Sequence, residues 1–218
     1  MYVEAEWDPR DPAGEMRFIA AVRKSGLPSV AVAQAWLHDD ACARVLESHA
    51  RHDFVRAIRH KPKSGMMDDA RWRAGYARLA PLGLHFELQA PWRQLGEATR
   101  LARAFAETTI VLNHTGLPLD PEIDGWRDAM ANLARCPNVA VKISGLGRVT
   151  KKRDVVLATI ELFGVPRCMF ASNFPVDRLC ASYDDVYGAF DEITQRFGEA
   201  ERRALFHDNA VRIYRMTA

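Results

Sequence analysis

The feature that most constrains this chain is a short apolar, β-branched segment that recurs seven times, at intervals of roughly 25–30 residues. Each segment predicts a strand, and each is followed by a stretch with helical periodicity. The strands are expected at 2–6, 29–36, 54–60, 84–89, 109–114, 139–144 and 168–172. Regular alternation of strand and helix is typical of α/β proteins with a parallel sheet.

The segments between and after these strands predict helices. They are expected at 11–24, after the capping pair Asp39 and Asp40, and at 68–82, 93–107, 121–135, 150–163, 183–197 and 199–214. Asp120 is the expected N-cap of the helix at 121–135.

A (β/α)8 or TIM barrel needs eight strand–helix units and carries its chemistry where the strands end. The chain supplies seven units, and Met1 lies directly before the first of them. We therefore predict a single TIM-barrel-like domain over residues 1–218, incomplete at its N-terminus, with about seven of the eight strands. An open doubly wound sheet ranks second, because no strand is followed by a GxGxxG or GxxxxGK loop.

The composition narrows the function classes. Thirty basic against twenty-eight acidic residues leave a net charge of +2, which argues against a dedicated nucleic-acid surface. The four cysteines lack CxxC spacing, which indicates reduced thiols in an intracellular protein. Because the chain opens without a signal-peptide pattern and has no apolar run of about 20 residues, we expect a soluble, cytoplasmic protein without membrane contact.

The sharpest candidate for chemistry is His114, at the end of the strand TIVLNH and directly before Thr-Gly-Leu-Pro. This position corresponds to the active-site mouth of a barrel. An imidazole there can bind a divalent metal or polarise a carbonyl group. The alternative is a histidine that only caps the strand through hydrogen bonds.

A second candidate lies after the last strand, in the segment FASNFPVD. Hydrolases of this architecture commonly place a carboxylate here to take a proton from the attacking water. The chain has Asn173, whose amide can bind substrate or water but cannot act as a base. Asp177 is the nearest carboxylate, and its alternative role is to cap the next helix or to pair with Arg178.

A third candidate is the charged strand FVRAIRH. Strand alternation places Arg56 and His60 on one face and Arg59 on the other. Arg59 or His60 can bind a substrate carboxylate by charge-assisted hydrogen bonds. The alternative, at least as good for Arg56, is an internal salt bridge. Its acidic partners would be Glu4, Glu6 or Glu87.

Two further pairs of polar residues share a strand face near the predicted mouth. They are Glu87 with Gln89, and Lys142 with Ser144. Such residues serve as substrate contacts or as members of an internal hydrogen-bond network, and the sequence favours neither. Trp36 also follows a strand and can either wall a pocket or pack in the core.

Six segments carry a resemblance that runs from Val3 to about Tyr214. They are VEAEWDP, FVRAIRHKP, LHFELQ, TIVLNHTGLP, VAVKISGLG and MFASNFPVD. In order and spacing they resemble the amidohydrolase-related proteins. The branch they are most similar to is that of the predicted TIM-barrel metal-dependent hydrolases, which includes sugar lactonases and pyrone-dicarboxylate lactonases.

The resemblance implies a distorted barrel that hydrolyses a lactone or a similar carbonyl compound. It implies a histidine late in the barrel, matched here by His114, an aspartate after the last strand, and an HxH pair on the first strand that binds a divalent metal in many members. Some lactonases of the group use arginines and histidines without a metal. This chain departs twice, because it contains no HxH and has Asn173 in place of the aspartate.

Two functional hypotheses follow. The first is a hydrolase of a small, anionic lactone. His114 polarises the carbonyl, with one divalent metal (zinc or manganese) or none, and Arg59 binds the substrate. Asn173 orients water or substrate, and Asp177 is the candidate general base. The second is a catalytically silent barrel fragment that lacks the HxH ligands, or a half-site completed by another subunit. A homo-oligomer is compatible with both, and a nucleic-acid partner with neither.

Overall fold

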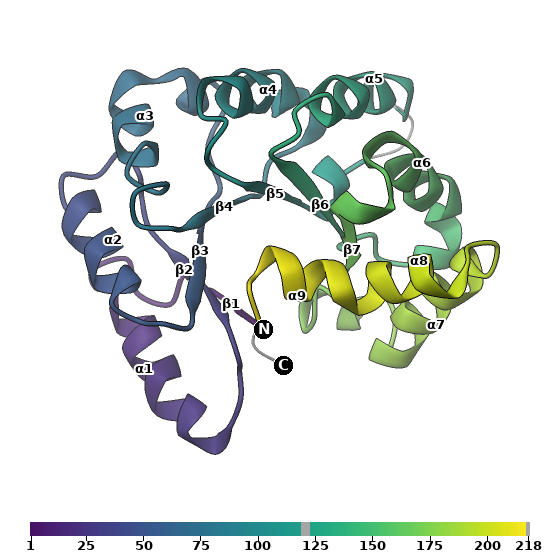
Figure 1. Cartoon of the computed structure of the whole chain (residues 1–218), viewed down its shortest axis with the longest axis horizontal. Helices are drawn as coiled ribbons and strands as arrows, with labels where there is room; N and C mark the ends of the chain where they lie inside the picture. Colours follow the sequence, from purple (N-terminus) through teal and green to yellow (C-terminus); the bar gives the residue numbers. More distant parts are fainter. Residues whose placement is uncertain (119–122, 217–218) are drawn as a thin grey trace.

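The computed structural model describes residues 1–118 and 123–216. Seven parallel strands form one sheet in chain order, and the sheet curls into a half-barrel with helices between the strands on its outer side (Figure 1). The strands are β1 (Tyr2–Val3), β2 (Ala31–Gln34), β3 (Val55–His60), β4 (His85–Leu88), β5 (Ile110–Asn113), β6 (Val139–Ile143) and β7 (Cys168–Phe170). Each lies inside the segment predicted for it, so the prediction of an incomplete TIM-barrel fold is confirmed.

The helices follow the predicted segments but are mostly shorter at their ends. They are α1 (Gly14–Val22), α2 (Cys42–Ala50), α3 (Ala70–Tyr76), α4 (Leu95–Ala104), α5 (Ile123–Ala134), α6 (Arg153–Phe163), α7 (Tyr183–Thr194), α8 (Glu199–Arg203) and α9 (Asn209–Ile213). The predicted N-cap Asp120 lies outside the described residues. In the described part of the chain, no helix is long and apolar enough to cross a membrane.

Strand alternation divides the buried side chains into two layers. The outer layer packs between the sheet and the helices, and Ile58, Phe86 and Trp72 belong to it. The inner layer fills the concave side of the sheet with small and β-branched residues. Its members are Val32, Ala57, Val111, Ala140 and Met169 from five strands, Val30 directly before β2, and Ile213 and Tyr214 near the end of the chain.

The last predicted helix is one element in the sequence analysis and three in the structure. A π-helical turn over Ala204–Asp208 separates α8 from α9. The end of α9 reaches the concave side of the sheet, close to the N-terminus (Figure 1). As a result Tyr214 is fully buried in the inner layer. The predicted helix over 199–214 is thus confirmed as one helical segment, 199–213, with a π-helical turn inside it.

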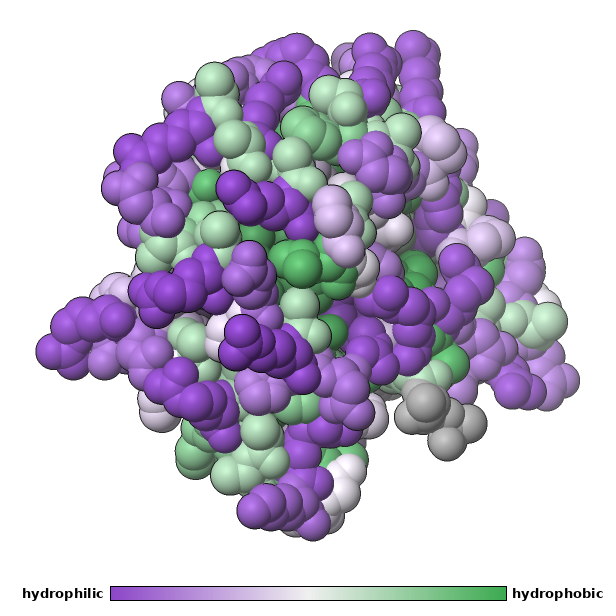
Figure 2. Space-filling view, turned by 60° about the vertical axis from the view of Figure 1, so that its left-hand side comes forward, coloured by the Kyte–Doolittle hydropathy of each residue, from purple (hydrophilic) through white to green (hydrophobic). Residues whose placement is uncertain are grey.

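The outer surface follows from the amphipathic helices. Figure 2 shows a face covered mainly by hydrophilic side chains, with smaller apolar areas between them. A helix that packs one stripe on the sheet exposes its polar face to water. The large apolar residues therefore pack between the sheet and the helices. Several polar residues are nevertheless buried inside the half-barrel, and packing alone does not explain them.

Candidate active site

The carboxyl ends of the strands carry a concentration of strained backbone. Five non-glycine residues directly beyond β1, β5 and β7 have positive φ angles: Glu6 (52°), His114 (56°), Thr115 (50°), Leu117 (53°) and Asn173 (55°). A left-handed backbone at such residues costs roughly 1–2 kcal/mol each and persists only where the surroundings enforce it. Strain of this kind clusters at functional sites, and here it marks the mouth of the half-barrel.

His114 owes its orientation to this backbone. Simple alternation would place it on the outer side with Leu112, but its Nδ1 atom lies 2.9 Å from Oγ of Ser144. Ser144 directly follows β6, on the same face as Ala140 of the inner layer. The left-handed turn therefore directs the imidazole toward the concave side of the sheet.

The environment of His114 keeps its ring neutral. The side chain is buried, with 9% of its surface exposed. Burial, and next the positive charges of Lys142 and Arg59, lower the pKa of His114 to about 4. At neutral pH the ring therefore has one N–H donor and one acceptor nitrogen.

Asp177 and Asn173 meet beside the loop after β6. The Asn173 amide donates to Oδ1 of Asp177 over 2.9 Å, and the Gly147 backbone also donates to this carboxylate. Burial raises the pKa of Asp177 in spite of these two hydrogen bonds. The same loop contacts the imidazole, since a Cβ on Gly145 would lie 2.6 Å from Nδ1 of His114. His114 and Asp177 therefore both contact the loop after β6, at Gly145 and Gly147 respectively.

The remaining interior residues form two ion pairs. Arg59 binds the Glu4 carboxylate and donates to the Glu4 backbone carbonyl over 2.7 Å. Lys142 binds Glu87 with Nζ–O distances of 2.9 and 3.2 Å. The internal salt bridge to Glu4 that the sequence analysis gave as the alternative for the charged strand is made by Arg59.

Arg56 lies at the amino end of β3, away from the predicted mouth. It donates to the backbone carbonyl of Tyr214 over 3.1 Å. His60 lies on the same outer face as Ile58, where its Nδ1 accepts from the indole N–H of Trp72 over 3.1 Å. The structure thus separates His60 from Arg59, as strand alternation predicts, and packs it between the sheet and α3. Gln89, after β4, is half-buried.

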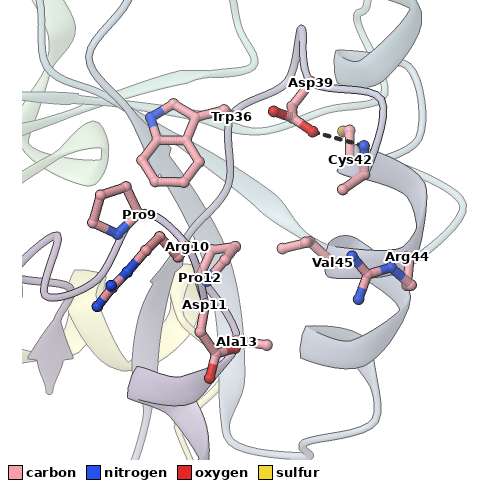
Figure 3. Close-up of a pocket in the computed structure, with 11 residues that line it drawn as sticks. Pro9, Arg10, Asp11, Pro12, Ala13, Trp36, Asp39, Cys42, Arg44 and Val45 are labelled. Carbon is pink, nitrogen blue, oxygen red and sulfur yellow. Dashed lines mark hydrogen bonds between the residues drawn. The ribbon is translucent and has the colours of Figure 1, made fainter.

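A separate cavity of about 240 Å³ lies beside this region, between the segments that follow β1 and β2 (Figure 3). The ring of Trp36 forms one wall, as the sequence analysis allowed. Other lining residues are Pro9, Pro12, Asp39, Cys42 and Arg44. The residues predicted for catalysis do not line this cavity, so it is distinct from the site around His114 and Asp177.

A metal ion does not fit the donor set seen here. A tightly bound zinc ion takes at least three protein ligands. Across residues 1–118 and 123–216, no three His, Cys, Asp or Glu side chains are grouped so that they could hold a metal ion. His114 brings one nitrogen at most, because Nδ1 is occupied by Ser144.

The curled parallel sheet, with polar residues at the carboxyl ends of its strands, places the protein in the class of (β/α)-barrel folds. The amidohydrolase family model matches residues 6–216, so the chain belongs to the amidohydrolase family. The uncharacterized protein y4mH of Sinorhizobium fredii is 39% identical over 239 residues, covering 99% of this chain and 80% of that protein.

Two further relatives carry more information. L-fucono-1,5-lactonase of Burkholderia multivorans is 30% identical over 185 residues, which are 73% of this chain and 62% of that enzyme. The crystal structure of a B. multivorans amidohydrolase with bound zinc superposes with a TM-score of 0.86 at 26% identity. This match covers 94% of our chain and 80% of the crystallised one.

Sequence reasoning missed two members of the interior. Tyr214 hydrogen-bonds Glu87, and Asn113 donates to the same carboxylate. Asn113 follows the inward-facing Val111 by two positions, so alternation could have identified it. No local pattern marks Tyr214, because its role depends on where the last helix ends.

Proposed function

We propose that the protein is a hydrolase that opens a small, anionic lactone or a related carbonyl compound by attack of water. Membership of the amidohydrolase family and the similarity to an L-fucono-1,5-lactonase support hydrolysis of a cyclic ester. The proposal for an anionic substrate rests on the charges around the imidazole. Besides burial, the positive charges of Lys142, Arg59 and Lys61 lower the pKa of His114, and the negative charge of Glu87 raises it.

In the proposed reaction the neutral imidazole of His114 polarises the substrate carbonyl, and the nearby cations stabilise the oxyanion that develops. Asp177 takes a proton from the attacking water and returns it to the alkoxide that leaves when the ring opens. Its raised pKa suits this exchange, because a carboxylate with an ordinary pKa is a weak base. Asn173 holds the carboxylate in place, and Arg59 binds the substrate through N–H groups not used by Glu4.

The observation that carries the proposal is the left-handed backbone of His114, together with the contact of its ring with the loop after β6 that also donates to Asp177. The test is hydrolysis of a panel of sugar lactones and pyrone dicarboxylates by the purified chain. His114→Ala should lower kcat/KM by about 100-fold or more. His207→Ala, at an exposed position, is the matched control and should retain activity. Unchanged turnover of His114→Ala would remove this residue from the mechanism.

A second candidate is a catalytically silent barrel. It is favoured by the missing group of three ligands in the described residues and by the absence of HxH from the sequence. The two candidates differ in one measurement. A silent barrel turns over no lactone with or without added zinc or manganese, whereas the proposed hydrolase does so in at least one of these conditions.

A further inference from the structure

The contact between Ser144 and His114 carries an inference about where the imidazole holds its proton. Ser144 is 2% exposed, and its Oγ lies 2.9 Å from Nδ1 of His114. Within the described residues this is the one hydrogen bond that the Ser144 side chain makes. The contact admits two arrangements, which differ in which partner donates.

In the first arrangement Nδ1–H donates to the serine oxygen. The Ser144 hydroxyl hydrogen is then left without an acceptor among the described groups, although the side chain is buried. A buried donor without a partner is strongly disfavoured, whereas a hydroxyl oxygen that accepts nothing is tolerated more easily.

In the second arrangement the Ser144 hydroxyl donates to Nδ1, and the hydroxyl hydrogen is satisfied. A neutral imidazole carries one proton, which must then lie on Nε2. His60 provides an internal precedent. Its Nδ1 atom faces two donors, the Trp72 indole at 3.1 Å and the Leu37 backbone at 3.4 Å, so its proton is also on Nε2.

The backbone around His114 leaves the ring little freedom to change this arrangement. The Cα atom of Gly145 packs so closely on the imidazole that a Cβ there would lie 2.6 Å from Nδ1. His114 itself sits in a left-handed turn. A 180° ring flip, which would put Cδ2 in the place of Nδ1, would have to displace this contact.

We propose that Ser144 is a positioning residue that fixes His114 as the tautomer protonated on Nε2, so that the imidazole offers the substrate a neutral N–H donor. This inference rests on the proposed function and refines it. His114 then hydrogen-bonds the carbonyl oxygen and takes no proton from water, and Asp177 is the base. Ser144, for which the sequence analysis left open a substrate contact or an internal hydrogen bond, then acts through His114.

The test is nitrogen NMR of the full chain labelled with ¹⁵N-histidine, with the His114 signals assigned by their loss in His114→Gln. The wild-type protein should show a protonated Nε2 and an unprotonated Nδ1. Ser144→Ala should populate both tautomers, and Ser25→Ala, at an exposed serine, should leave the His114 signals unchanged. A wild-type ring protonated on Nδ1, or a tautomer unaffected by Ser144→Ala, would overturn the inference.

The kinetic test separates positioning from binding. Ser144→Ala should lower kcat about tenfold or more while KM changes less than about threefold, because the lost contact orients a group that acts in the transition state. Equal kcat for both proteins would also overturn the inference. If the wild-type chain hydrolyses no lactone but shows the expected tautomer, the proposed function fails, but the assignment of the His114 tautomer stands.

Discussion

The hydroxyl of Tyr214 hydrogen-bonds the carboxylate of Glu87, which lies on β4, 127 positions earlier in the chain. Both side chains are fully buried on the concave side of the sheet. Burial alone would raise the pKa of Glu87, but Lys142 and hydrogen bonds from Tyr214 and Asn113 lower it. The end of the chain is therefore part of the system that holds a buried carboxylate in its charged form.

Tyr214→Phe removes one donor from this carboxylate without changing the volume much. We expect a loss of about 1.5–3 kcal/mol in the free energy of unfolding, the usual range for a hydrogen bond to a charged group. Denaturant titration measures it. Tyr183→Phe, at a position 51% exposed, should change stability by less than about 0.5 kcal/mol. Equal effects of the two substitutions would contradict the assigned role.

Lys142→Met leaves Glu87 as a buried charge without its cation. Removing one member of a buried ion pair costs about 3–5 kcal/mol, and adding Glu87→Gln should recover part of this loss. Lys61→Met is the matched control, because its pair with Glu6 is exposed on both sides and is worth less than about 1 kcal/mol. A double variant less stable than Lys142→Met would count against the pairing.

Gly145→Ala tests the contact between the loop after β6 and the imidazole. The residue has φ 63°, and the added Cβ would lie 2.6 Å from Nδ1 of His114. We expect lactone turnover to fall about 100-fold, because the ring must move. Gly65→Ala has a similar backbone, φ 83°, but no atom within 4 Å of the new Cβ. It should cost stability and leave turnover unchanged.

Asp177→Asn tests the proposed base. An amide cannot accept the proton, so kcat/KM should fall by about 10²–10⁴. In the wild type, kcat/KM should decline as the pH falls through the pKa of Asp177, which burial places above the ordinary aspartate value of 3.8. Asp154→Asn, at an exposed helix position, should have no effect. A wild-type profile that is flat down to pH 4 would exclude Asp177 as the base.

The stability of the protein should fall as the pH is lowered from about 6.5 to 4. His49 is fully buried, hydrogen-bonds the Gln34 carbonyl, and has its pKa lowered to about 4, chiefly by burial. In this window the unfolded chain binds a proton at His49 that the folded chain does not. The stability that neutral His49 contributes is therefore complete above pH 6.5 and is lost on acidification.

His49→Gln should make the pH dependence between 6.5 and 4 shallower, by up to about 3 kcal/mol over the window. His207→Gln, whose ring is 66% exposed, should leave the slope as it is. Parallel slopes for wild type and His49→Gln would show that another group controls acid unfolding.

The strands could be predicted because each is a compact apolar run, and Val139–Ile143 lies inside its predicted segment. Alternation also separated His60 from Arg59 correctly, because the side-chain period of a strand is fixed by geometry. The sequence analysis offered Glu4, Glu6 and Glu87 as acidic partners for this strand, but could not choose among the three. Glu4 and Arg59 meet across the sheet, and neither position alone carries a signal for the other.

The orientation of His114 illustrates a different limit. A strand pattern extended through this residue would place it on the outer face, and it is the left-handed backbone that reverses its direction. Whether a non-glycine residue adopts such an angle depends on tertiary packing rather than on its own preference. The residue type at the strand end could therefore be identified from sequence, but not the direction of its side chain.

The late position of Tyr214 also has a consequence during synthesis. Until this residue emerges from the ribosome, the concave side of the sheet lacks both its aromatic filling and one donor for Glu87. Nascent chains that do not yet include Tyr214 should accordingly remain loosely ordered and sensitive to proteases, and a truncation just before this residue should be as damaging as a lesion in the middle of a strand.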